Sequence, residues 1–244
     1  MSLEIRHDDP DQIDKTEASS RVSSPIPVYT TTLIIAIGIV FIAQLAEGLD
    51  KSILRAGFVK QAFLHDHEYW RILTGATTHA SIIHVVMNCY AFYSFGRIFE
   101  MLTNRAHLGI VFLLSAIGGG ILSLILLPDA ISVGASGGIV GLVSYLAVYS
   151  FKRRDFISPQ FRKSLLLNIG FILVFGLVLY QVVDNWGHIG GLITGATYGL
   201  VQISSDGYSD PREASLPVEY AGVAAIGIYL AACAFSVLKI IQVI

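Results

Sequence analysis

The sequence predicts an all-α fold, in which a bundle of helices crosses a membrane several times. Only 14% of the 244 residues are charged, while 54% are hydrophobic. A soluble domain usually carries about 25% charged residues. The hydrophobic residues gather in runs, and a helix needs about 20 such residues to cross a bilayer. The runs show no strand-like alternation, and helices satisfy their own backbone hydrogen bonds in lipid, so we expect a polytopic helical bundle.

Seven apolar runs follow one another along the chain, and each predicts one membrane-spanning helix. They cover residues 28–46, 82–99, 108–127, 139–151, 165–183, 189–203 and 218–241. The segment 1–26 has no apolar centre, which predicts a disordered tail and an uncleaved first anchor instead of a signal peptide. The loop 47–71 is long enough to form a structured element in the membrane interface. The fourth and sixth runs are short unless their helices begin at Ser136 and His188, which places both residues just below the membrane surface.

The distribution of lysine and arginine predicts the orientation of the spans. Five basic residues lie in FKRRDFISPQFRK between the fourth and fifth runs, and others lie in the tail and after the second run. The loops PDAISVGA and DNW carry none, although the loop 47–71 departs from the pattern with four. We therefore expect a multi-pass protein with a cytoplasmic N-terminus, and with Ser136 and His188 near the outer face. An uncleaved anchor without an organelle presequence favours a bacterial inner membrane.

Composition and motif content exclude several classes of protein. The net charge of −2 provides no basic field that would recruit nucleic acid. Cys89 and Cys233 both lie inside apolar runs, which indicates neither a disulfide framework nor a cysteine metal site. The zinc-protease pattern H-E-x-x-H is absent from the sequence. We expect no metal, no cofactor and no nucleic-acid partner.

Ser136 is a candidate nucleophile, although a serine in a membrane span more often serves helix packing. Its G-x-S-x-G pattern carries no weight, because that pattern has meaning between a strand and a helix. His188 changes the interpretation, since it starts HIGGLITG, where Gly191 and Gly195 return to nearly the same helical face. Gly137 beside Ser136 offers a matching small surface. Two such faces can pack closely and bring an imidazole within about 3 Å of a hydroxyl, so we expect His188 to activate Ser136.

The second run contributes two polar side chains, His84 and Asn88, which lie four residues apart on one helical face. Polar residues inside a membrane are costly and mostly face the bundle interior. Both can donate hydrogen bonds, and acyl transfer needs donors where the carbonyl oxygen becomes negative. A purely structural polar pair is the alternative interpretation. We expect His79 at the helix start in a structural role, where it forms a polar mouth for water with Ser81 and Asn185.

Several of these motifs occur together in a known order. The stretch WRILTGATTHASIIHVVMNCYAFYSFGRIFE contains a Trp-Arg pair, His-x4-His-x3-Asn and Gly-x3-Glu, and GASG and HIGGLITG follow it. In this order the motifs resemble those of the rhomboid intramembrane serine proteases, over roughly residues 30–203. Thr77 stands where phenylalanine is frequent in that family, and Gly187 where alanine is frequent. Neither departure removes a catalytic group.

The resemblance implies a catalytic dyad of Ser136 and His188. It also implies an oxyanion hole made by His84, Asn88 and the backbone N–H of Ser136. The positions to which it gives structural or site-shaping roles are Trp70, Arg71, Glu100 and Gly134. The expected organisation is a cytoplasmic tail at 1–26, a six-helix rhomboid-like core at 27–204, a cytoplasmic linker at 205–217 and an additional seventh helix within 218–244.

These features predict an intramembrane serine endopeptidase that cuts transmembrane segments near the extracytoplasmic face. Its partners would be the lipid bilayer and transmembrane proteins with small or helix-destabilising residues at the cut, because an intact helix in lipid resists attack. Asp184 lies four residues before His188 and is expected at the water boundary, without a catalytic role.

Two other functions fit parts of the sequence. One is a non-proteolytic protein that binds membrane helices in quality control, for which Ser136→Ala would change nothing. The other is a transporter or metal carrier with His79, His84 and His188 as ligands. The apolar runs contain only one carboxylate, Glu219 near the start of the last run, and this scarcity speaks against the second alternative.

Overall fold

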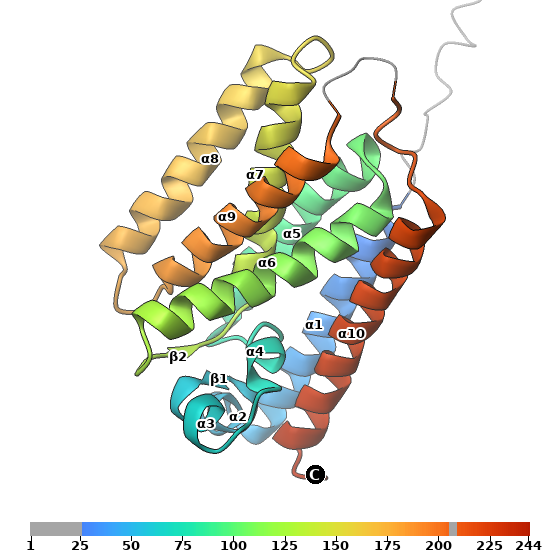
Figure 1. Cartoon of the computed structure of the whole chain (residues 1–244). Coiled ribbons are helices and arrows are strands. Elements are labelled where there is room, and N and C mark those ends of the chain that lie inside the picture. Colours follow the sequence, from blue (N-terminus) through green and yellow to red (C-terminus); the bar gives the residue numbers. More distant parts are fainter. Residues whose placement is uncertain (1–25, 205–208) are drawn as a thin grey trace, which may run out of the picture.

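The computed structural model describes residues 26–204 and 209–244. Over these residues the chain is an all-α polytopic membrane bundle of long helices, with short elements gathered at one end (Figure 1). The helices long and apolar enough to cross a membrane are α1 (Val28–Glu47), α6 (Arg105–Leu126), α8 (Pro159–Val178) and α10 (Leu216–Ile240). The predicted fold class is confirmed. The predicted tail 1–26 and linker 205–217 lie partly outside the described residues.

The remaining long helices are α5 (Ile82–Leu102), α7 (Ser136–Lys152) and α9 (Asn185–Gln202). Each apolar run falls largely within one long helix, but the helix ends differ from those of the runs. The largest shift is in α8, which begins at Pro159 instead of 165 and ends at Val178 instead of 183. Ser158 accepts a hydrogen bond from the backbone N–H of Phe161, and Pro159 occupies the first turn. Polar capping therefore fixes this helix start, and an apolar run cannot reveal it.

Helix α7 lies at the centre of the bundle, where nearly all of its residues from Gly138 to Ser150 are buried. Helices α6, α7 and α9 form the most extensively packed group in the described chain. Helix α5 joins this group through Phe92, whose ring stacks on Phe112 of α6 with the centroids 4.6 Å apart. The two helices that begin near Ser136 and His188 therefore belong to the most extensively packed part of the described fold.

The loop 47–71 forms a structured element, as the sequence predicts. It contains α2 (Leu49–Ala56), β1 (Phe58–Val59) and α3 (Lys60–His65), and α4 (Arg71–Thr74) follows. Strand β1 pairs antiparallel with β2 (Ile131–Ser132), with Phe58 opposite Ser132. The sequence did not predict these two-residue strands, because they are too short to show alternation. Since β2 lies just before Ser136, the strand pair ties this element to the serine loop.

Arg71 and Trp70 hold the short elements in place. The Nη1 of Arg71 donates hydrogen bonds to the carbonyl oxygens of Leu54 at 3.1 Å and Gly57 at 2.8 Å. The ring of Trp70 packs edge-on against Phe235 of α10, with the centroids 5.2 Å apart. Both side chains thus make structural contacts away from Ser136.

Helix α10 packs along α1 and α6 and reaches the segment before α5. The hydroxyl of Tyr229 donates a hydrogen bond to the carbonyl oxygen of Ala76 at 2.8 Å. The Oγ1 of Thr77 and the Oγ of Ser236 also hydrogen-bond, at 2.8 Å. The seventh long helix is therefore joined to the bundle by buried polar contacts as well as by apolar packing.

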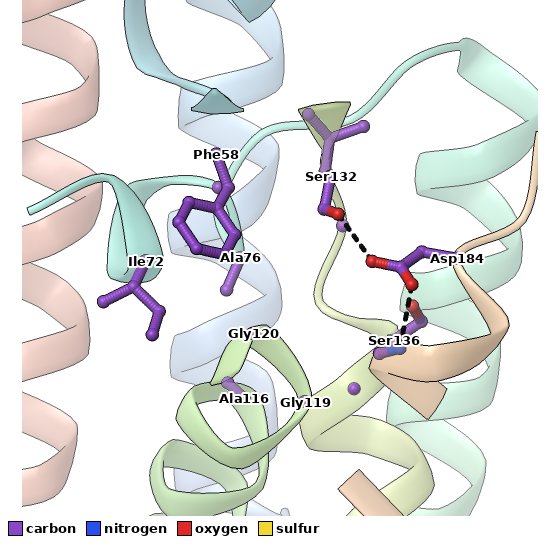
Figure 2. Close-up of a pocket in the computed structure, with 14 residues that line it drawn as sticks. Phe58, Ile72, Ala76, Ala116, Gly119, Gly120, Ser132, Ser136 and Asp184 are labelled. Carbon is purple, nitrogen blue, oxygen red and sulfur yellow. Dashed lines mark hydrogen bonds between the residues drawn. The ribbon is translucent and has the colours of Figure 1, made fainter. Parts of the chain in front are cut away.

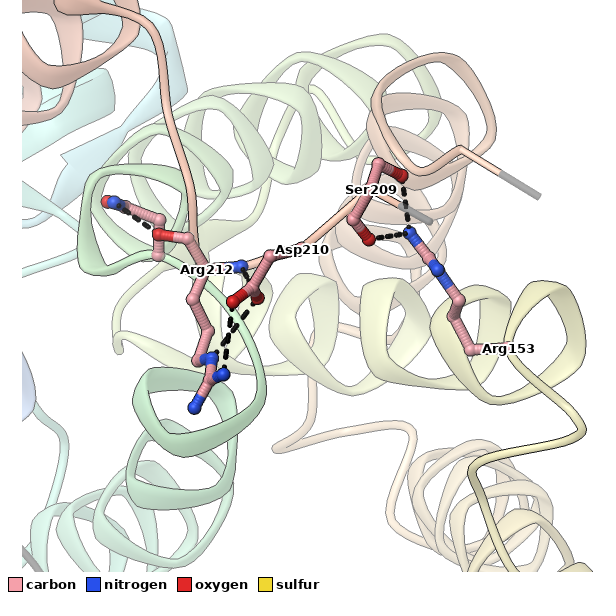
Figure 3. Close-up of polar contacts among 5 residues, drawn as sticks. Arg153, Ser209, Asp210 and Arg212 are labelled. Atoms are coloured by element: carbon pink, nitrogen blue, oxygen red, sulfur yellow. Dashed lines mark hydrogen bonds and ion pairs between the residues drawn. The ribbon is translucent and has the colours of Figure 1, made fainter. Parts of the chain in front are cut away.

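At the opposite end of the bundle, further polar contacts join segments far apart in sequence. Arg153, at the end of α7, donates to both the carbonyl oxygen and the Oγ of Ser209, each at 2.8 Å (Figure 3). Ser209 is the residue at which the described chain resumes. The carboxylate of Glu100 accepts hydrogen bonds from the backbone N–H of Thr30 at 2.8 Å and from its Oγ1 at 2.7 Å. Glu100 thus caps the first turn of α1, and its role in this structure is to hold α5 against α1.

Candidate active site

Ser136 is the first residue of α7 and follows a sharply bent loop. Gly134 has a φ of 114°, in the left-handed region that glycine adopts without strain. Its N–H donates to the carbonyl oxygen of Gly75 at 2.9 Å. A Cβ on Gly134 would lie 2.7 Å from the ring of His84. A glycine is therefore needed both for the turn and for the close approach of the imidazole to the serine loop.

The structure brings Ser136 and His188 together. The Nε2 of His188 and the Oγ of Ser136 are 2.9 Å apart, a hydrogen-bonding distance. Both side chains are half-buried at one end of the bundle. The apolar run suggested that this helix begins at His188. Helix α9 instead begins at Asn185, so His188 lies in its first turn.

Glycine contacts between α7 and α9 make this distance possible. A Cβ on Gly191 would collide with the backbone of Gly137, and one on Gly195 would collide with the backbone of Gly141. The two helices therefore touch backbone to backbone directly below the Ser136–His188 pair. Larger residues at these positions would separate the helices and with them the two side chains.

The two ring nitrogens of His188 differ in their contacts, since Nε2 hydrogen-bonds with Ser136 and Nδ1 points away from it. Its Nδ1 is buried and makes no hydrogen bond to any residue in the described part of the chain. If Nδ1 carries the proton of the neutral ring, Nε2 is free to accept a hydrogen bond from the hydroxyl. The geometry is that of a serine–histidine pair without a third acidic partner on the imidazole.

His84 and Asn88 lie on the helix that faces the serine loop. Ser81 caps α5 by accepting a hydrogen bond from the backbone N–H of His84 at 3.1 Å. The N–H of Ala80 donates to the Nδ1 of His84 at 3.5 Å, which leaves the proton of the neutral ring on Nε2, the edge beside Gly134. One turn further, the Nδ2 of Asn88 donates to the carbonyl oxygen of His84 at 3.0 Å and keeps a second hydrogen. Both side chains can therefore donate hydrogen bonds.

His79 is fully buried and supports this arrangement from behind. Its N–H donates to the Oε1 of Gln44 at 2.9 Å, and its carbonyl oxygen accepts from the Nε2 of Gln44 at 3.1 Å. Its ring lies edge-on to the ring of His84, with the centroids 5.0 Å apart. The prediction that His79 lines a polar mouth with Ser81 and Asn185 is wrong, because the double hydrogen bond to Gln44 holds His79 inside.

A cavity of about 40 Å³ lies beside Ser136. Figure 2 shows Phe58, Ile72 and Ala76 on one side of it and Asp184 on the other. The carboxylate of Asp184 faces inward and is half-buried, and it accepts hydrogen bonds from the hydroxyls of Ser123 and Ser132. The sequence did not reveal this position, because the hydroxyls that bind the carboxylate come from other segments.

Within the described residues, no three histidine, cysteine, aspartate or glutamate side chains gather in a way that could hold a metal ion. The three histidines of the metal-carrier alternative make other contacts. His188 is hydrogen-bonded to Ser136, while His79 and His84 pack ring against ring.

Comparison with known proteins agrees with the motifs. The family model described as "Rhomboid domain" matches residues 66–205. The chain is 36% identical over 153 residues to "RHOMBOID-like protein 6, mitochondrial" of Arabidopsis thaliana, which covers 61% of this chain and 49% of that protein.

Two further relatives differ in what their names state. "Rhomboid protease GluP" of Bacillus subtilis (strain 168) is 30% identical over 145 residues, covering 59% of this chain and 28% of that protein. "Inactive rhomboid protein 1" of Papio anubis is 29% identical over 130 residues, covering 52% of this chain and 15% of that protein. The chain spans about half or less of the length of these three curated relatives.

Proposed function

Since the chain belongs to the rhomboid family, we propose that it is an intramembrane serine endopeptidase. It cleaves transmembrane segments of other membrane proteins near the extracytoplasmic face, with Ser136 as nucleophile and His188 as general base. The observation that carries this proposal is the 2.9 Å distance between the Ser136 Oγ and the His188 Nε2 inside a membrane bundle. The similarity to a relative named as a protease gives further support.

The proposed reaction begins when the Ser136 Oγ attacks a peptide carbonyl carbon and the His188 Nε2 takes the hydroxyl proton. The carbonyl oxygen becomes negative, and the side chains of His84 and Asn88 donate hydrogen bonds to it. The backbone N–H of Ser136 is a further donor, because it lies in the first turn of α7 and has no partner within that helix. Loss of one such donor typically costs about 10²–10³ in rate.

The intermediate then collapses, and His188 returns the proton to the leaving amine. A water molecule attacks the acyl-enzyme, His188 takes a proton from it, and Ser136 is released with its hydroxyl restored. A peptide in an intact helix cannot enter such a site, because its carbonyl is already hydrogen-bonded in lipid. Substrates are therefore proposed to carry small or helix-destabilising residues at the cut.

The protein is an integral membrane protein. We propose that its N-terminus is cytoplasmic, since the basic residues gather on that side. The further expectation of a bacterial inner membrane gains no support from the relatives, because they come from a plant and an animal as well as from a bacterium. The core 27–204 is proposed as the catalytic unit, with α10 as an added helix.

The test is cleavage of a model transmembrane substrate by the purified protein in detergent, compared with Ser136→Ala and His188→Ala. Ser144→Ala is a matched control, because this buried serine lies on the same helix and its hydroxyl donates to the carbonyl oxygen of Gly141 within that helix. Cleavage by the parent and by Ser144→Ala, but by neither of the other variants, is expected.

A non-proteolytic helix-binding protein is the second candidate, which the similarity to a relative named as inactive favours. It predicts that the parent protein and Ser136→Ala capture the substrate equally and that neither cuts it. That result, or equal cleavage by all four proteins, would exclude the proposed serine protease.

A further inference from the structure

A polar cluster lies beside the cavity, and each of its members comes from a different element. We define the Lys60 cluster as Lys60 of α3, Ser123 of α6, Ser132 of β2 and Asp184, which precedes α9. The Nζ of Lys60 donates to the Oγ of Ser123 at 2.7 Å. Ser123 in turn donates to the Oδ2 of Asp184. The Oγ of Ser132 donates to the same oxygen at 2.5 Å, as Figure 2 shows.

The cluster encloses two opposite charges that one hydroxyl connects. The side chain of Lys60 is only 1% exposed, and Ser123 is fully buried. Burial lowers the pKa of Lys60, and the negative charge of Asp184 acts in the opposite direction. Removing the charge of Asp184 leaves the buried Lys60 cation without the nearby opposite charge, which is unfavourable. The cluster is therefore one connected hydrogen-bond network that joins the cation, the hydroxyls and the carboxylate, and the Nζ of Lys60 also donates to the carbonyl oxygen of Leu127 at 2.9 Å.

Asp184 links this unit to the helix that carries His188. Its Oδ1 accepts a hydrogen bond from the N–H of Gly187 at 2.8 Å, which caps α9. Its carbonyl oxygen accepts from the N–H of His188 at 3.2 Å. The first turn of α9, and with it the imidazole, is thus fixed to Asp184 through both the side chain and the backbone.

The same carboxylate also holds the segment that carries the nucleophile. Ser132, which donates to Oδ2, lies four residues before Ser136 in the chain. Strand β2 is further held by its pairing with β1, next to Lys60. One carboxylate is therefore bonded on one oxygen to the helix of His188 and on the other to the strand that leads to Ser136.

We propose that Asp184 is a positioning residue, whose carboxylate, bonded to Ser132 and held by Lys60 through Ser123, sets the position of Ser136 relative to His188. This inference rests on the proposed protease function and adds to it four residues outside the dyad. Asp184 is not the acid of a catalytic triad, because its oxygens bind the hydroxyls and the Gly187 N–H instead of the Nδ1 of His188.

The first experiment measures kcat and KM for Asp184→Asn with a transmembrane substrate. Asparagine keeps the shape and can still cap α9, but it loses the charge and places an NH₂ group or a weaker acceptor against the two hydroxyls. We expect kcat to fall about 10- to 100-fold, as for a small misplacement of reacting groups, with KM changed less than about twofold. Asp129→Asn is the matched control. That carboxylate is exposed at the same end of the bundle and accepts a hydrogen bond from Gln61.

A second variant separates the positioning role from simple loss of stability. Lys60→Met removes the buried cation, and the double variant Lys60→Met/Asp184→Asn removes both charges. If the cluster acts as a unit, the double variant recovers melting temperature relative to Asp184→Asn, while its kcat stays low. A normal kcat in Asp184→Asn would overturn the inference. So would a kcat of the double variant whose fold-loss equals the product of the fold-losses of the two single variants.

The geometry can be tested without any activity. In a crystal or cryo-electron microscopy structure of Asp184→Asn, we expect the distance between the Ser136 Oγ and the His188 Nε2 to exceed hydrogen-bonding range. An unchanged distance would overturn the positioning role. A parent protein that cuts no substrate would instead contradict the proposed function, and this distance would still test the role of Asp184.

Discussion

Helices α8 and α9 have similar lengths and follow one another in the chain, yet they are held in the bundle in opposite ways. The residues of α9 that are buried are Gly190, Gly191, Gly195 and Gly199, and α9 packs closely on both α6 and α7. In α8 only Leu165 and Gly176 are buried. Helix α8 lies at the edge of the bundle (Figure 1). Most of its apolar side chains are exposed there, where lipid surrounds a membrane protein.

The difference shows where the fold needs precision. Packing between membrane helices depends on close contact, and small residues allow the closest approach of two backbones. Helix α9 carries His188, whose ring must lie within hydrogen-bonding distance of Ser136. Helix α8 carries no residue of the candidate site, so its contacts with the bundle can be few without disturbing the dyad.

The largest expected effect comes from adding one methyl group to the α9 interface. In Gly191→Ala, the new Cβ collides with the backbone of Gly137, which cannot move aside as a side chain could. The helices must separate, and a displacement of about 1 Å at reacting groups costs about 10²-fold in rate. Overpacking also costs about 1–3 kcal/mol of stability. Cleavage rate and melting temperature in detergent measure both effects.

Gly170→Ala in α8 is the matched control, because nothing lies within 4 Å of a Cβ at that position. Alanine favours a helix over glycine by about 0.5–1 kcal/mol, so the melting temperature should stay level or rise slightly while cleavage stays normal. Equal losses of activity in Gly191→Ala and Gly170→Ala would contradict the contrast between the two helices.

The second prediction concerns the point where α8 is attached. Leu165 is only 2% exposed. Its replacement by alanine should lower the free energy of unfolding by about 2–5 kcal/mol, because a cavity replaces its buried methyl groups. Leu167→Ala, on the same helix but 63% exposed, should have a much smaller effect. If the two variants melt at the same temperature, α8 is not anchored through Leu165.

The sequence could predict the features that apolar runs and glycine spacing define, but not those that polar caps or tertiary contacts define. The seven long helices of the described chain followed from apolar runs, and the glycine spacing of HIGGLITG indicated the close face of α9. The start of α8 at Pro159 did not follow, because polar capping residues define it. The inward position of Asp184 did not follow either, since Lys60 and Ser123 lie far from it in sequence and only the tertiary fold brings them to it.

A third prediction uses α10, which also lies at the side of the bundle but is joined to it by buried polar contacts. In Tyr229→Phe, the carbonyl oxygen of Ala76 loses its donor, and an unsatisfied buried group costs about 1–3 kcal/mol. We expect a lower melting temperature and a reduction in cleavage of a few fold, because Ala76 adjoins Gly75, which binds Gly134 of the serine loop. Tyr220→Phe is the control, since Tyr220 is 73% exposed on the same helix. Identical behaviour of the two variants would mean that α10 contributes apolar packing alone.

The smallest effect is expected for Gly176→Ala, at the end of α8 nearest the start of α9. A Cβ there meets the side chain of Asn185, whereas a Cβ on Gly191 meets backbone. A flexible amide can rotate away, so cleavage should change less than twofold and the melting temperature should fall less than in Gly191→Ala. The same glycine-to-alanine change thus separates a contact that can yield from one that cannot. A loss of activity as large as that of Gly191→Ala would show that α8 is fixed against α9 as rigidly as α7 is, and the contrast between the two helices would then fail.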